Sequence, residues 1–268
     1  MAIDAVQVGN ITRLLSAERL KALNDLTQSP AEAIDLHQET LRLGNSLMTV
    51  IGTIELSLRN AVCENLTGHF GVANWLRQPP APFQWREPEL KKVGQAHDQA
   101  CRAEYAKLTQ AGKHALDALA YPKGRPANKS HAARAKDRRK QIVVSDGKVI
   151  SEITLYFWKR LYGPEYEQTL WRTSLKHTFP YKRLSRADVA SKLEFIYQAR
   201  NRLAHHEPVL HRRFTDTMLA IDFIIQHLEA APPSAATPLA NLLADDIIQV
   251  RDRANALHGR LAAFRTTP

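Results

Sequence analysis

The fold class is decided by residues 30–62, PAEAIDLHQETLRLGNSLMTVIGTIELSLRNAV. Ser29, Pro30 and Glu32 form a helix start there, because serine caps the first turn, proline suits the first position and glutamate follows three residues after the cap. Apolar residues then recur at the three- and four-residue spacing of one helix face. They are Leu36, Leu43, Leu47, Ile51, Ile54, Leu58, Ala61 and Val62. We therefore expect one long helix that ends near Gly68, with Gly44 or Gly52 either bending it or letting a neighbour approach closely.

The remaining sequence also favours helices. Further helices are expected over residues 89–118, 152–162 and 209–230, together with one that ends near Ala204. Residues 77–88 contain four prolines and predict a loop. The only expected strands form a short β-hairpin over residues 143–149, turning at Asp146-Gly147. The predicted fold class is all-α, a helical bundle with this single hairpin.

The C-terminal part predicts a linker and one amphipathic helix. Residues 232–238, PPSAATP, have the composition of a linker, so residues 1–231 are expected to form one domain. In residues 239–268, apolar side chains follow a spacing close to a heptad repeat. Two interpretations stay open for this helix, packing against its own chain or pairing with a second subunit.

Composition narrows the class of protein. The chain has 268 residues, of which 44% are hydrophobic and 24% charged, as in ordinary globular proteins. Two cysteines, Cys63 and Cys101, are too few for a disulfide framework and give little support to a cysteine-based zinc site. No metal or cofactor is predicted. No apolar run reaches the ~18 residues of a membrane helix, and the N-terminus lacks an export signal. We expect a soluble, cytoplasmic protein that does not bind membranes.

Positive charge is concentrated in one segment. The formal net charge is +10, and residues 123–140 hold eight lysines and arginines against one acid, Asp137. Such a cluster attracts a phosphate-rich partner such as RNA, although a solvated surface loop has the same composition. Gly124, Pro126 and Asn128 favour a mobile insertion over a rigid helix. The candidate RNA-binding residues are Lys123, Arg125, Lys129, Arg134, Lys136, Arg138, Arg139 and Lys140.

The most informative stretch for chemistry is residues 198–210, QARNRLAHHEPVL. Pro208 disfavours helix at the preceding residue, so the helix is expected to end around residues 204–207. Arg200 then lies in its last turns, and His205 lies at its exit. On an ideal helix these two residues point about 140° apart, whereas Asn201 and His205 are four residues apart and can face each other. Arg200 and His205 therefore meet at one phosphate only if the helix unwinds or a second copy lies opposite.

Arginine and histidine suit one class of reaction well. Arginine is a permanent, fork-shaped ligand for phosphate oxygens, and histidine titrates near neutrality and serves as general base or acid. RNA carries its own nucleophile, the 2′-hydroxyl group, so these residues are sufficient for cleavage without a metal. Two other interpretations stay open: the histidine pair caps the end of the helix, or His205, His206 and His211 bind a metal. The metal site is poorly supported, because no acidic partners accompany these histidines.

Residues 199–209, ARNRLAHHEPV, resemble the RNxxAHHEP signature of the Abi-like (abortive-infection) proteins. Residues 149–158, VISEITLYFW, are similar to that family's "ISELTFGFW" block, and Trp171 and Phe179-Pro180 fall where the family has them. Residues 54–61, IELSLRNA, resemble an N-terminal block. Together these blocks cover about residues 12–228 in the family's order.

This resemblance implies a HEPN-like helical bundle and a metal-independent endoribonuclease of phage defence, toxin-like and active as a homodimer with a composite active site. Arg200 corresponds to the motif arginine, Asn201 to the polar residue after it and His205 to the motif histidine, while His206 belongs to the Abi-like signature alone. Glu55, Arg59 and Asn60 match the N-terminal block and either line the cleft or brace the helices. An inhibitory protein or a small RNA is the kind of partner that restrains such an activity. The alternative is a non-catalytic HEPN protein that binds RNA or regulates a partner.

Overall fold

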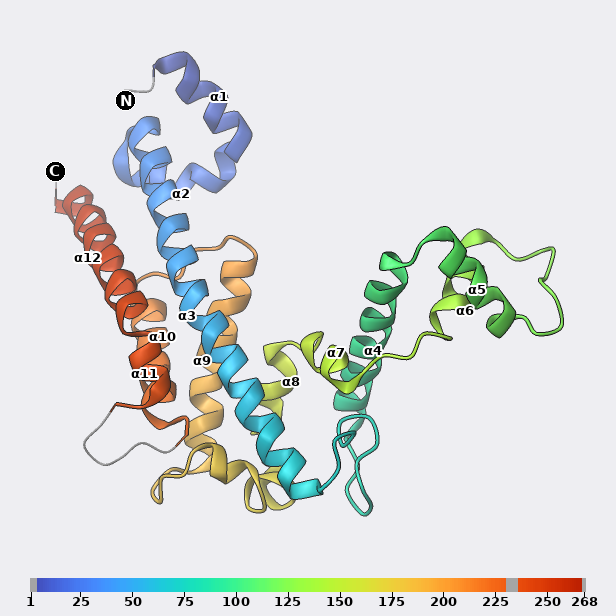
Figure 1. Cartoon of the computed structure of the whole chain (residues 1–268). Helices are drawn as coiled ribbons and strands as arrows, with labels where there is room; N and C mark the ends of the chain where they lie inside the picture. Colours follow the sequence, from blue (N-terminus) through green and yellow to red (C-terminus); the bar gives the residue numbers. More distant parts are fainter. Residues whose placement is uncertain (1–3, 230–235, 267–268) are drawn as a thin grey trace. The chain divides into compact units, whose positions relative to one another are not determined.

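The computed structural model describes residues 4–229 and 236–266 (Figure 1). Every regular element in these residues is a helix, which confirms the predicted all-α class. Backbone proximity divides the chain into two compact units, one of residues 1–61 and 177–268 and the other of residues 62–176. We call them the first and the second unit. None of the helices in the described ranges is both long and apolar enough to cross a membrane.

The first unit contains the helices that carry the Arg-His motif. Helix α9 packs against α10, and α12 contacts α2 and α11. Its core includes Leu47, Ile51, Leu193, Ile221 and Val250, which are all fully buried or nearly so. The elements are α1 (Ala5–Leu15), α2 (Ala17–Thr27), α3 (Pro30–Phe70) as far as residue 61, α9 (Arg186–Ala204), α10 (His211–His227), α11 (Pro238–Leu242) and α12 (Ala244–Thr266).

The second unit is built on α4, which contacts both α6 and α7. Its core is aromatic: Trp75, Trp85, Phe157 and Trp158 are buried, and the Trp85 ring meets the Phe157 ring edge-on. The elements are the end of α3, α4 (Glu87–Lys107), α5 (Gln110–Ala120), α6 (His131–Arg139), α7 (Asp146–Ser151), α8 (Leu155–Arg160) and short turns at Pro164–Tyr166 and Glu167–Trp171; a further turn, Leu175–Thr178, extends into the first unit.

Helix α3 forms as its sequence predicts. The Ser29 hydroxyl accepts a hydrogen bond from the Glu32 backbone N–H at 3.4 Å, and all eight apolar residues of the predicted face are buried. Gly44 is needed for close packing, because a Cβ atom there would lie 3.1 Å from Cδ2 of Leu203 in α9. Glycine therefore brings α3 next to the last turn of α9, as the sequence suggested.

The predicted hairpin at residues 143–149 is wrong. Helix α7 begins inside it, because Ser145 caps the helix by accepting a hydrogen bond from the Lys148 backbone N–H, and Asp146 lies in the first turn, where negative charge is favourable. Val149, which lies in this helix, is fully buried. The aromatic helix expected over residues 152–162 is shorter, since α8 covers only Leu155–Arg160.

The single helix predicted over residues 89–118 is also wrong. It is divided at Leu108, which is extended, and a new helix begins with Thr109 as its cap. The Thr109 hydroxyl accepts a hydrogen bond from the Gly112 backbone N–H at 3.2 Å. Side-chain capping by threonine thus starts α5 where apolar periodicity alone suggested continuity.

The basic segment is not an irregular insertion throughout. Residues 131–139 form α6, whose cap is Ser130, and three cations occupy its last turn, where positive charge is favourable. Alanine-rich sequence, HAARAKDRR, gives this stretch good helix propensity. The expectation of a wholly mobile segment was therefore wrong for its second half.

The C-terminal apolar seam packs within the first unit. Leu243, Val250, Ala254, Leu257 and Leu261 are buried in the chain itself, so the same-chain interpretation of the heptad pattern holds for them. The predicted linker lies partly outside the described residues, at 230–235. Its last residues begin a helix instead, because Thr237 caps α11 and Pro238 takes the first position.

Candidate active site

Helix α9 ends in a Schellman turn at the histidine pair. His205 is the last half-helical residue, and His206 takes a left-handed conformation with φ +55°. The His206 backbone N–H donates to the Leu203 carbonyl at 3.0 Å, and the Glu207 N–H donates to the Arg202 carbonyl at 2.8 Å. These are the two hydrogen bonds that define the motif. The helix thus ends where Pro208 predicted, and it ends in a defined geometry.

Side chains hold this turn in place. Arg202 forms an ion pair with Glu207 at 2.9 Å, and its Nε donates to the Pro208 carbonyl at 3.3 Å. Arg19 of α2 donates to the His206 carbonyl at 3.1 Å. Because the turn is fixed by these contacts, the exposed side chains of His205 and His206 start from a stable backbone.

Arg200 is anchored to α3 through Glu55. The Arg200 Nε lies 4.0 Å from Glu55 Oε2, and Glu55 Oε1 lies 3.6 Å from the Arg59 guanidinium one turn further along α3. The Glu55 and Arg59 side chains are each 14% exposed, whereas that of Arg200 is 35% exposed. A partly shielded carboxylate therefore orients a guanidinium that keeps a surface toward solvent. Asn60, the third residue of the N-terminal block, is exposed on α3.

The two motif residues do not meet within one chain. No hydrogen bond or ion pair among residues 4–229 and 236–266 joins Arg200 to His205. The same range contains no side-chain bond between Asn201 and His205. Their link is through the backbone, where the Asn201 carbonyl accepts from the His205 N–H at 3.2 Å. Within the described residues, no side-chain contact therefore joins the two motif residues.

A pocket of about 220 Å³ opens beside the turn, within the first unit. Helix α3 contributes Thr40, Asn45 and Met48, and the end of α9 contributes Ala204 and His206. Gly44 and Leu203, whose close approach brings the two helices together, also line this pocket. Small ligands therefore have space next to the histidine pair.

The structure separates the basic segment into paired and unpaired cations. Arg138 is 5% exposed and donates two hydrogen bonds of 2.6 Å to the Asp117 carboxylate, which lowers the pKa of Asp117 to about 2. Arg125 lies 3.5 Å from the same carboxylate, and Lys129 pairs with Asp137 at 2.5 Å. Arg138 is therefore a core residue, not an RNA-binding one. Lys123 is exposed, and Arg134 is half-buried.

Three cations of the segment without a carboxylate partner line a pocket, which we call the phosphate-sized pocket. Lys136, Arg139 and Lys140 line it from the end of α6, and Arg102 lines it from α4. His97, Asp98 and Cys101 complete the lining of this space of about 200 Å³. Burial, together with Asp98, raises the pKa of the Cys101 thiol. Four cations thus surround one small concave surface within the second unit.

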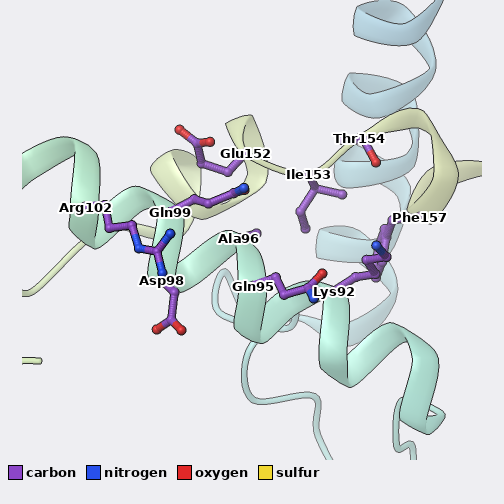
Figure 2. Close-up of a pocket in the computed structure, with 10 residues that line it drawn as sticks. All are labelled: Lys92, Gln95, Ala96, Asp98, Gln99, Arg102, Glu152, Ile153, Thr154 and Phe157. Carbon is purple, nitrogen blue, oxygen red and sulfur yellow. The ribbon is translucent and has the colours of Figure 1, made fainter. Parts of the chain in front are cut away.

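A larger space of about 430 Å³, which we call the neutral pocket, lies on the same helix (Figure 2). Figure 2 shows Lys92, Gln95, Gln99 and Arg102 projecting from α4, with Glu152, Ile153 and Thr154 on the facing segment. Asp98 and Arg102 line both pockets, so the two spaces share one border.

Sequence reasoning missed the contribution of α4 to these pockets. Arg102 stands apart from the basic segment along the chain, and no motif marks it. The available signal was the charged pair Asp98 and Arg102 four residues apart, which places them on one helix face. Only the folding of α6 onto α4 shows that Arg102 joins the cations of the basic segment.

No group of three or more histidine, cysteine, aspartate or glutamate side chains in the described part of the chain is arranged to hold a metal ion. Comparison with known proteins gives no match to any family model, curated protein or solved structure. The similarity to Abi-like proteins therefore remains a resemblance of short sequence blocks. What the fold and site define is an all-helical protein with an Arg-His motif at a fixed helix end.

Proposed function

We propose that the protein is a metal-independent endoribonuclease of phage defence, active as a homodimer whose two motifs form one cleft. The observation that carries the proposal is the end of α9, where a partly exposed, Glu55-anchored Arg200 and an exposed His205 lie five residues apart on a fixed backbone. Neither side chain is buried in a core, as a purely structural pair would be.

In the proposed reaction, His205 removes the proton of a ribose 2′-hydroxyl group. The 2′-oxygen attacks the neighbouring phosphorus, a 2′-O–P bond forms and the P–O5′ bond breaks. The leaving 5′-oxygen takes a proton from water, and the protonated His205 returns its proton to the solvent. Arg200 binds the non-bridging oxygens and stabilises the charge that builds up on them. The products are a 2′,3′-cyclic phosphate and a 5′-hydroxyl end, with no net change in redox state.

Two copies are proposed because no side-chain contact joins Arg200 to His205 within one chain, and an ideal helix directs these residues about 140° apart. A phosphate that reaches both side chains fits between the Arg200 of one copy and the His205 of the other. Leu56 and Phe195, on the two helices that carry Glu55 and Arg200, are 54% and 37% exposed. A homodimer interface is a surface that covers such side chains.

The test is cleavage of labelled RNA by purified protein in EDTA. Loss of a general base typically costs about 10²–10⁴-fold in rate, and loss of a charge-stabilising donor about 10²–10³-fold. We expect such losses for His205→Ala and Arg200→Ala, with His206→Ala as the matched control. Mixing the two inactive variants should restore part of the activity, because a mixed dimer has one intact Arg-His pair. Cleavage that needs a divalent ion, or that survives His205→Ala, contradicts the proposal.

A second candidate is a non-catalytic HEPN protein that binds RNA or regulates a partner. The observation that favours it is the Arg200–Glu55 ion pair, since a neutralised arginine serves as well to brace α9 against α3 as to bind phosphate. RNA binding without cleavage by the wild type, unchanged in Arg200→Ala and His205→Ala, and no growth arrest on expression would support this candidate.

A further inference from the structure

The fold divides the cations of the basic segment into those that pair with a carboxylate and those that do not, and three of the second group line a pocket. Arg125, Lys129 and Arg138 each have a carboxylate within 3.5 Å. No carboxylate of the described residues lies within ion-pair distance of Lys136, Arg139, Lys140 or Arg102. Three of the five cations of the basic segment without a carboxylate, together with Arg102, therefore line the phosphate-sized pocket, whereas Lys123 and Arg134 do not.

This arrangement favours an anion with several oxygens. Asp98 is the single carboxylate that lines the pocket, against four lysine and arginine side chains and His97. Cations that converge on a concave surface raise the local potential and concentrate anions there. Arginine pairs with phosphate through two parallel hydrogen bonds, and lysine adds a compact charge. A phosphate group matches this combination.

The neighbouring neutral pocket suggests what is attached to the phosphate. Its charged lining is balanced, with Lys92 and Arg102 against Asp98 and Glu152. Gln95, Gln99 and Thr154 offer uncharged donors and acceptors, and Ile153 and Phe157 provide an apolar wall. Ligand sites commonly combine an apolar wall with a few polar groups that fix orientation, and a nucleoside has faces and edges of both kinds.

We propose that the second unit binds a nucleotide, with its phosphate in the phosphate-sized pocket of α4 and α6 and its nucleoside in the neutral pocket of α4, α7 and α8. Arg102 lines both pockets and lies at the junction of phosphate and sugar. The site goes beyond the proposed ribonuclease activity, since its residues belong to the second unit while Arg200 and His205 belong to the first. The nucleotide is either free or one unit of an RNA strand.

The experiment is isothermal titration of the full chain at about 0.15 M salt, where exposed charges are screened beyond roughly 8 Å. The probes are inorganic phosphate, the four nucleoside 5′-monophosphates and a short single-stranded RNA. The test variant is Lys136→Gln/Lys140→Gln, both exposed side chains of the pocket. The control is Lys91→Gln/Lys176→Gln, which removes the same charge from exposed positions of the second unit outside both pockets.

We expect the pocket variant to weaken binding about tenfold or more, because it removes two charge-assisted contacts, while the control changes affinity less than about twofold. Arg139→Gln should act in the same direction. Gln99→Ala should weaken the binding of the nucleotide but not that of inorganic phosphate. If the pocket variant binds the monophosphates more weakly than the wild type does, the site is assigned to a free nucleotide. If only its affinity for RNA falls, the site is assigned to one unit of a strand.

If the pocket and control variants lose affinity equally, or if the wild type binds none of the probes, the proposed site is overturned. Phosphate binding as tight as nucleotide binding overturns the nucleoside half. This site is tested by nucleotide binding to the Lys136→Gln/Lys140→Gln variant and the ribonuclease proposal by RNA cleavage in EDTA, so the failure of one and the failure of the other are distinguishable.

Discussion

The two adjacent histidines at the end of α9 should respond in opposite directions to glycine. His206 has φ +55°, in the left-handed region, whereas His205 has φ −98°. A left-handed conformation destabilises a residue with a Cβ atom by roughly 1–2 kcal/mol, and glycine avoids this cost. The extra freedom of glycine in the unfolded chain offsets about 0.5–1 kcal/mol of that gain. His206→Gly should therefore stabilise the protein by about 0.5–1 kcal/mol. His205→Gly removes no strain and should destabilise it by about 0.5–1 kcal/mol.

Thermal and urea unfolding measure this pair of variants directly. For a chain of this size, a change of about 1 kcal/mol shifts Tm by roughly 2–4 °C, so the two variants should lie on opposite sides of the wild type. Cleavage of RNA adds an independent result: His206→Gly should retain activity, and His205→Gly should lose it. If His206→Gly is the less stable of the two, the Schellman geometry and the division of roles between the histidines are both refuted.

Three further predictions concern the first unit. Gly44→Leu should cost about 1–3 kcal/mol of stability by overpacking against Leu203, measured by urea unfolding with the exposed Gly68→Leu as control; equal stability would contradict the close helix approach. Burial chiefly lowers the pKa values of His37 and His258 below 6.5, so the unfolded chain binds protons that the native protein does not, and stability should fall as the pH drops below about 6.5. His37→Gln/His258→Gln should flatten this pH dependence, and an unchanged slope would refute its assignment. Phe195→Glu should reduce the mass measured by light scattering to that of a monomer and lower cleavage with it, and an active, unchanged dimer would exclude this face as the interface.

The sequence predicted the elements whose signals are local and strong. The apolar period of α3 and its serine-proline start predict one helix with a defined first turn, and the structure has that helix. The proline after the histidine pair predicts the end of α9, which the structure also shows. The errors lie where a capping side chain outweighed the pattern around it. Ser145 begins a helix at a sequence typical of a hairpin turn, and Thr109 begins a new helix within an apolar period that appeared continuous.

The candidate site was predictable only in part for a related reason. The positions of Arg200 and His205 near the end of α9 follow from Pro208, but the Glu55 contact depends on how two distant helices pack. Composition treated the eight cations of the basic segment as equivalent. Asp117 and Asp137 pair with three of them, and the contribution of Arg102 came from another helix.

The central claim is that the 2′-hydroxyl group of RNA is the nucleophile and that Arg200 and His205 act on it without a metal. Its most direct test is analysis of RNA ends after incubation in EDTA with two matched oligonucleotides, one all-ribose and one with a single 2′-deoxy sugar at the mapped cleavage position. We predict 2′,3′-cyclic phosphate and 5′-hydroxyl ends from the first and no cut at that position in the second. Cleavage of the deoxy-substituted strand at the same position, or products with 5′-phosphate ends, would contradict the claim.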